Sequence, residues 1–207
     1  MTPSMKKLCA LFLFFLIPTV SLAESHKLIH AYRSGSEIYV SRSLEGEYGP
    51  LAMINAGENS EGLKSEMWRG YGFRNSTGIE IMKFIQLGVS HTFLNLRSKE
   101  SRLQSLSGSR LTGDMKFAFV SPVGNLEMGG GPTILRLDYQ NEGTLEDFIG
   151  NGYYYALGVN YFLTSRLSLS FYGRTFRESL VRSGGDESIE GAISNTRGLS
   201  MGAKIWL

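Results

Sequence analysis

The chain ends with the stretch Leu199-Ser200-Met201-Gly202-Ala203-Lys204-Ile205-Trp206-Leu207, in which apolar residues occupy every second position. The residues between them are Ser200, Gly202, Lys204 and Trp206. Successive side chains of a β-strand point to opposite faces, whereas a helix would scatter these apolar residues around its surface. The stretch therefore predicts a terminal strand with one apolar face.

The same period-two alternation recurs upstream, most clearly at residues 114–119, 153–161 and 166–174. Counting back from the C-terminus predicts eight strands. We expect them near residues 36–44, 66–74, 79–97, 109–121, 126–140, 152–163, 166–178 and 192–207. The chain is therefore expected to be all-β.

Three features depart from plain alternation. Arg69 falls on the apolar face of the second predicted strand, and Lys83 interrupts the apolar face of the third. The fifth contains Gly129-Gly130-Gly131-Pro132, which cannot form an ordinary central strand. We expect a bulge there, which shifts the register so that Met128 and Leu135 share a face.

The predicted connections alternate in length. Tight turns are expected at residues 75–78, 122–125 and 164–165, which are rich in residues that turns favour. Longer polar links are expected at residues 45–65, 98–108, 141–151 and 179–191. Short turns on one rim and long loops on the other are the plan of an outer-membrane barrel, whose short side faces the periplasm.

The N-terminus has the pattern of a Sec-type signal peptide. Lys6 and Lys7 precede the apolar run 8–17, Pro18 ends that run, and Ser21-Leu22-Ala23 supplies the small residues of a cleavage site. A membrane-anchoring helix is the alternative, but the run is too short to span a bilayer. We expect residues 1–23 to be removed and residues 24–207 to form one barrel domain.

Composition excludes several classes of function. The only cysteine, Cys9, leaves with the signal peptide, so the mature chain has no disulfide, zinc thiolate or cysteine nucleophile. The formal net charge of +2 falls to near neutral without Lys6 and Lys7, so no basic excess points to nucleic acid.

Alternation alone does not say whether the apolar face meets lipid or a dry core, because soluble barrels alternate as well. The polar face carries very small residues, such as Ala156 and Gly158, which suit the interior of a narrow barrel. The apolar face carries a candidate aromatic girdle of Tyr153, Tyr155 and Tyr161. These features favour an outward apolar face that contacts lipid.

The C-terminal segment resembles the β-signal that outer-membrane proteins present to the barrel assembly machinery. Its carriers are Gly202, Ile205, Trp206 and Leu207. It departs from that pattern where Met201 replaces a polar residue and where Leu207 replaces the common terminal Phe. The whole mature chain resembles small OmpA/OmpX-type barrel domains. The resemblance implies an eight-stranded antiparallel up-and-down transmembrane β-barrel in the outer membrane of a Gram-negative cell, in contact with outer-membrane lipid and lipopolysaccharide.

Several charged residues are expected to face the lumen of such a barrel. They are Glu80, Asp114, Lys116, Arg136, Asp138, Arg174 and Lys204. Opposite charges in a narrow bore should pair, because an unpaired buried charge costs several kcal/mol. We expect a salt-bridged plug, and the alternative is a narrow pathway gated by those pairs.

No catalytic, cofactor-binding or metal site is predicted. His26 and His30 lie in a polar N-terminal segment, where Glu24 alone could complete a metal site. Adjacent residues of a strand point to opposite faces, so Ser90 and His91 cannot form a nucleophile–base pair. The His-x-Ser arrangement of lipid A deacylases is absent, because Phe93 stands two residues after His91.

Three functions remain open at this point. The first is a non-enzymatic role in envelope integrity or surface interaction, with an extracellular ligand bound through the loops. The second is a small channel or a transporter of small or apolar molecules, and the third is a lipid A-modifying enzyme. A cluster of cations at Arg97, Lys99, Arg102 and Arg110 could hold phosphates of lipopolysaccharide or of a host polyanion.

Overall fold

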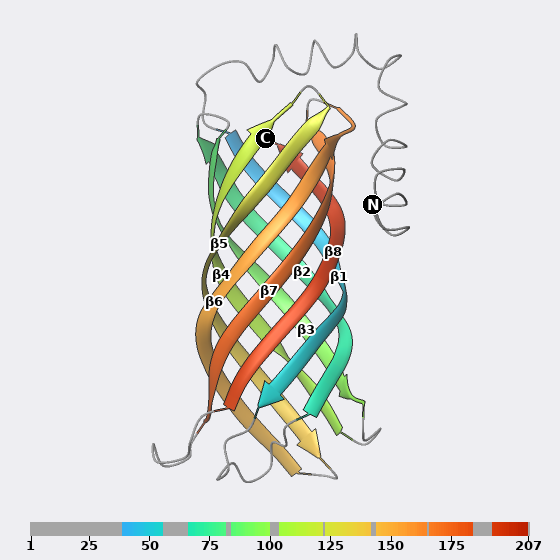
Figure 1. The fold of residues 1–207 in the computed structure, drawn as a ribbon, viewed down its shortest axis with the longest axis vertical. Helices are drawn as coiled ribbons and strands as arrows, with labels where there is room; N and C mark the ends of the chain where they lie inside the picture. Colours follow the sequence, from blue (N-terminus) through green and yellow to red (C-terminus); the bar gives the residue numbers. More distant parts are fainter. Residues whose placement is uncertain are drawn as a thin grey trace, which may run out of the picture.

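Eight antiparallel strands form a closed barrel (Figure 1). The computed structural model describes residues 39–55, 66–81, 84–99, 104–121, 123–141, 144–164, 166–183 and 192–206. The strands are β1 (Tyr39–Asn55), β2 (Glu66–Ile81), β3 (Ile85–Ser98), β4 (Gln104–Val120), β5 (Gly124–Asn141), β6 (Thr144–Phe162), β7 (Leu167–Arg182) and β8 (Ala192–Trp206). The predicted all-β, up-and-down architecture is confirmed. No helix in this part of the chain is long and apolar enough to cross a membrane.

The ring closes between the first and last strands. Ser41 pairs with Trp206 and Leu44 with Ala203, while every other strand pairs with its neighbours along the chain. Closure leaves no strand edge with unpaired N–H and C=O groups. The expected signal peptide, residues 1–23, and the histidines His26 and His30 lie outside the described residues.

The two ends of the barrel differ. The connections 82–84, 121–123 and 163–166 lie at one end, which we call the turn end and which also holds the end of β8 (top of Figure 1). The connections at the opposite end, the loop end, are 56–65, 99–103, 142–143 and 183–191. All three connections at the turn end are short, but those at the loop end are not all long, because only residues 142–143 join β5 to β6.

Several predicted boundaries are wrong, and most err in the same direction. β1 runs to Asn55 rather than to residue 44, and Asn141 pairs directly with Thr144, so there is no long link at 141–151. The predicted turn at 75–78 is also wrong, because Ser76 pairs with Ser90 within β2 and β3. At the loop end, polar residues that resemble a loop in the sequence belong to the strands.

The predicted bulge in β5 is absent. Residues 124–141 pair without interruption with residues 144–161 of β6. Met128 is therefore outside and 45% exposed, whereas Leu135 is inside and 1% exposed. A register irregularity occurs instead in β1, between Tyr48 and Leu51, around Gly49 and Pro50.

The apolar face changes sides along β5, although the strand keeps its phase. Near the turn end Leu126 and Met128 are exposed on the outer wall, and Glu127 between them is buried inside. Near the loop end Leu135 and Leu137 are buried inside, and Arg136 between them is exposed. A change of surroundings from lipid to water outside the same wall accounts for this reversal.

Other strands show the same reversal at about the same height. Outward apolar side chains run from Leu111 to Phe119 in β4 and from Tyr153 to Tyr161 in β6. Runs of about nine residues match the ~9–11 that a tilted strand needs to cross a bilayer. Between this apolar band and the loop end, polar residues such as Ser107, Asn151 and Arg177 face outward.

An apolar core fills the barrel at the loop end. Its members are Trp68, Leu94, Leu96, Leu106, Leu135, Leu137, Tyr139, Phe148, Leu180 and Ala192. Trp68 and Tyr139 meet edge to face, with ring centroids 6.0 Å apart. This end resembles a water-soluble barrel, with an apolar inside and an outside that is mostly polar, although Leu145, Ile149, Val181 and Ile193 are exposed there.

Gly158 provides space for a large side chain within the lumen. A Cβ at this position would overlap the ring of Tyr172 and lie 2.6 Å from the carbonyl oxygen of Phe171. The missing side chain lets Tyr172 reach across to Glu127, to which its hydroxyl donates a hydrogen bond.

We expect Gly158→Ala to lower the free energy of unfolding by about 1–3 kcal/mol, because overpacking displaces Tyr172. Urea unfolding of the barrel in lipid vesicles measures this. The control is Gly173→Ala, where a Cβ would meet no atom closer than 3.9 Å. Equal stability of the two variants would contradict the packing argument.

Candidate functional site

The lumen contains a balanced set of buried charges. Among the described residues, five cations and six carboxylates are buried inside the wall. The cations are Arg74, Arg110, Lys116, Arg174 and Lys204, and the carboxylates are Glu45, Glu47, Glu80, Asp114, Glu127 and Glu178. Near-balance within a closed wall requires that these groups satisfy one another.

Glu127 is the centre of the tier nearest the turn end. Its Oε1 accepts hydrogen bonds from Asn160 at 2.6 Å, from Gln86 at 2.8 Å and from Lys204 at 3.0 Å. Its other oxygen accepts from Tyr172, and Lys116 lies 4.0 Å away. Five strands thus converge on one carboxylate.

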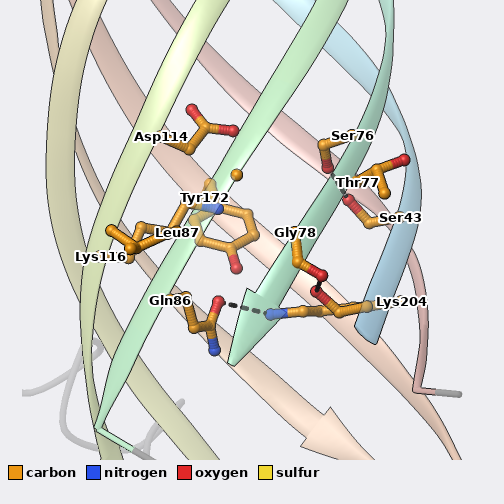
Figure 2. A pocket seen from close by; sticks show the side chains of 12 residues that line it. Ser43, Ser76, Thr77, Gly78, Gln86, Leu87, Asp114, Lys116, Tyr172 and Lys204 are labelled. Carbon is orange, nitrogen blue, oxygen red and sulfur yellow. Dashed lines mark hydrogen bonds between the residues drawn. The ribbon is translucent and has the colours of Figure 1, made fainter. Parts of the chain in front are cut away.

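Lys204 bridges two sides of this tier. Its Nζ donates to Gln86 Oε1 at 2.7 Å (Figure 2). The same Nζ also donates to Glu127 Oε1. Lys116 and Tyr172 lie beside this bridge in the same view. The cavity that these residues line has a volume of about 20 Å³, room for about one water molecule.

Two arginines dominate the middle tier. Arg74 donates to Asp114 at 2.9 Å, and Arg174 donates to Glu45 at 2.6 Å. Glu47 lies between the two guanidinium groups, 4.0 Å from Arg74 and 3.8 Å from Arg174. The shared carboxylate connects the two pairs into one network across the bore.

Hydroxyl groups complete the middle tier. Ser90 donates to Asp114 Oδ2 at 2.7 Å, and the hydroxyl of Tyr154 donates to Oδ1 of the same carboxylate.

His91 is on the outer wall, where its ring packs against Phe93 with centroids 4.4 Å apart. Ser90 and His91 therefore lie on opposite faces, as the sequence indicates.

A two-pronged ion pair forms the third tier. Arg110 donates to Glu178 from Nε at 2.7 Å and from Nη2 at 2.8 Å. Its guanidinium carbon lies 3.8 Å above the ring of Phe176. The apolar core of the loop end follows directly. In β7 the next inward residue after Glu178 is Leu180, and in β4 Leu106 is separated from Arg110 by only one inward position, Gly108.

The structure places five of the predicted lumen residues inside: Glu80, Asp114, Lys116, Arg174 and Lys204. It places Arg136 and Asp138 on the outer wall, which corrects the prediction for these two. Arg136 lies 3.2 Å from Asp147 and 3.8 Å from Asp138, with its side chain 63% exposed. A bulge at Gly129–Pro132 would have turned both side chains into the lumen, and that bulge is absent.

The remaining predicted residues lie as follows. Tyr153 and Tyr155 point outward at mid-strand in β6, and Tyr161 lies near the turn end. Gly202 and Ile205 lie in β8, and Trp206 points inward. Leu207 lies outside the described residues.

Sequence reasoning missed six lumen charges. The inward orientation of Glu127 and Glu178 could have been predicted from alternation, because each lies between outward residues of a predicted strand. Glu45 and Glu47 were missed because the predicted first strand stopped at residue 44. Arg74 and Arg110 were missed because they were assigned to a strand end and to a loop rim.

The described residues contain no group of three or more His, Cys, Asp and Glu side chains that could hold a metal ion. His91 is the single histidine in that part of the chain, and its partner is an aromatic ring. The lumen groups are engaged with one another, so the arrangement suits a rigid, closed interior.

No protein-family model matches the chain, and no curated protein matches it in sequence. Among solved structures, neisserial surface protein A is similar over 81% of this chain and 96% of that chain, with 17% identity and a TM-score of 0.55. The outer-membrane protein OprG of Pseudomonas aeruginosa gives 8% identity and a TM-score of 0.49, covering 84% of this chain and 97% of its own. The attachment invasion locus protein Ail of Yersinia pestis gives 14% identity and a TM-score of 0.43, covering 79% and 97%.

The likeness to neisserial surface protein A concerns the fold. It agrees with the closed ring of eight strands found in this chain. Backbone polar groups that cross hydrocarbon must all be paired, and a closed ring meets that need. The chain is an eight-stranded transmembrane β-barrel of the outer-membrane type.

Proposed function

We propose that this protein is a non-conducting, non-catalytic barrel of the Gram-negative outer membrane that serves envelope integrity or surface interaction. The observation that carries the proposal is the filling of the lumen. Three ion-paired tiers and an apolar core follow one another along the bore, and the cavity beside Lys204 has room for only about one water molecule. A bore filled in this way supports a rigid anchor rather than a pathway.

The outer wall supports the same proposal. The continuous apolar band begins at the turn end and stops partway along the strands, so the loop end extends beyond the membrane as a stem with a mostly polar surface. Short turns of such barrels face the periplasm. In this orientation the stem and its loops face the medium, where a surface ligand would bind.

The membrane placement is tested by fractionation. We expect the protein in the outer-membrane fraction, with heat-modifiable migration on a gel, because the folded barrel resists detergent until it is heated. We also expect Glu24 as the first residue of the mature chain by N-terminal sequencing. Recovery of a folded monomer from the periplasmic wash would overturn the placement.

The closed bore is tested in planar lipid bilayers. We expect no discrete conductance steps from the purified, folded barrel, because each tier is held by hydrogen-bonded charges and the apolar core excludes ions. A porin reconstituted in the same way serves as the positive control. Steady openings of reproducible size would favour the transport alternative instead.

The role of Glu127 is tested by Glu127→Gln. We expect a loss of about 3 kcal/mol in the free energy of unfolding in vesicles, because Lys204 and Lys116 lose the charge of their common carboxylate. The matched control is Asp138→Asn on the outer wall, with an expected change below about 1 kcal/mol. Similar losses in both variants would show that Glu127 is not the centre of the network.

A further inference from the structure

Two arginines on the outer wall stand directly opposite each other. Arg69 of β2 pairs in register with Arg97 of β3, and both side chains are exposed. Like charges at directly opposed positions of neighbouring strands are destabilising. Within the described part of the chain, no carboxylate forms an ion pair with either guanidinium. An anion bound between the two guanidinium groups would relieve this repulsion.

More positive charge lies close to the pair. Lys99 directly follows β3 and is exposed, and its backbone N–H donates to the carbonyl oxygen of Met67 in β2 at 3.1 Å. Arg197 of β8 occupies the same lateral row, since both Arg69 and Arg197 pair with Leu51 of β1. The wall thus carries a cationic row at the level where the apolar band ends.

A groove adjoins the arginine pair on its membrane side. The groove has a volume of about 540 Å³ and lies across β2 to β5. Tyr71, Phe73 and Phe93 form one side, and Ser107 and Ser109 leave room at its floor. Tyr71 is the outward residue next to Arg69 and is 65% exposed, so aromatic surface and cation are adjacent.

The opposite side of the groove does not attract anions. Arg136 and Asp138 line it, and Asp147 lies beside them. Two carboxylates contact one guanidinium there, which leaves a negative balance. The charge pattern therefore orients a ligand, with its anionic group at Arg69 and Arg97 and its apolar part in the groove.

We propose that the arginine pair and the adjoining groove bind one molecule of phosphorylated, acylated glycolipid of the lipid A type. The proposal rests on the outer-membrane placement, because only a lipid of the outer leaflet presents phosphates at the border of the apolar band that faces the loop end. A phosphate accepts hydrogen bonds from two guanidinium groups at once. An acyl chain packs against Tyr71, Phe73 and Phe93.

The test compares two lipids on the folded barrel in zwitterionic micelles, by native mass spectrometry. We expect bisphosphorylated lipid A to bind about tenfold more tightly than its dephosphorylated form, as charge-assisted hydrogen bonds require. The double variant Arg69→Gln, Arg97→Gln should abolish the difference. The matched control is Arg177→Gln, which removes an exposed arginine of β7 that lies away from the groove. This variant should keep the tenfold difference in affinity between the two lipids.

A second arm tests the groove. We expect Ser107→Phe to weaken binding of both lipids, because the ring fills the space for the acyl chain. The control is Thr175→Phe, on the exposed outer face of β7. Heat-modifiable migration verifies that each variant is folded, which is expected because all five substituted positions are on the outer wall.

Three results would overturn the lipid site. They are equal affinity for the two lipids in the wild-type barrel, equal loss in Arg177→Gln, and tighter binding of a soluble sulfated oligosaccharide than of lipid A. Each would leave a folded, non-conducting outer-membrane barrel in place. Failure of the site is therefore distinguishable from failure of the proposed function.

Discussion

The closed hydrogen-bond ladder is the constraint on which the rest of the structure depends. Because every strand is bonded on both sides, no residue can be inserted or removed without disturbing a neighbour, and each side chain has a fixed face. What changes along the barrel is the medium outside it. The same face of β5 presents Met128 to hydrocarbon and Arg136 to water, and the interior changes from Glu127 to Leu135 in compensation.

This constraint explains how much of the fold the sequence predicts. Where lipid surrounds the wall, apolar residues are outside, and alternation such as Leu167, Leu169 and Phe171 identifies strand and face together. At the loop end the same alternation has the opposite meaning. Residues 45–55 and 144–151 were assigned to loops because polar outward residues in a strand resemble a polar link. A bulge at Gly129–Pro132 was expected because it kept the apolar face outside throughout.

The lumen was predictable in kind and less so in detail. Alternation is enough to place Lys116, Arg174 and Lys204 inside, since their strands are regular and lie within the apolar band. It gives no partners, because partners come from strands far apart in the chain. Glu45 and Arg174 meet across the ring, and Arg110 meets Glu178 in the same way. The arginine pair on the outer wall depends on the register of β2 and β3, which no local pattern reveals.

The network of tiers also limits how such a barrel can enter the membrane. If β7 entered the hydrocarbon by itself, Arg174 would have no counter-ion there, and Glu45 would have none if β1 entered by itself. Each unpaired charge would cost several kcal/mol. The two residues lie near opposite ends of the chain and neutralise each other only when the last strand joins the first. We therefore expect the strands to associate before or during their insertion into the membrane. The electrostatic cost of the unpaired charges favours concerted insertion of the whole barrel over insertion of one strand at a time.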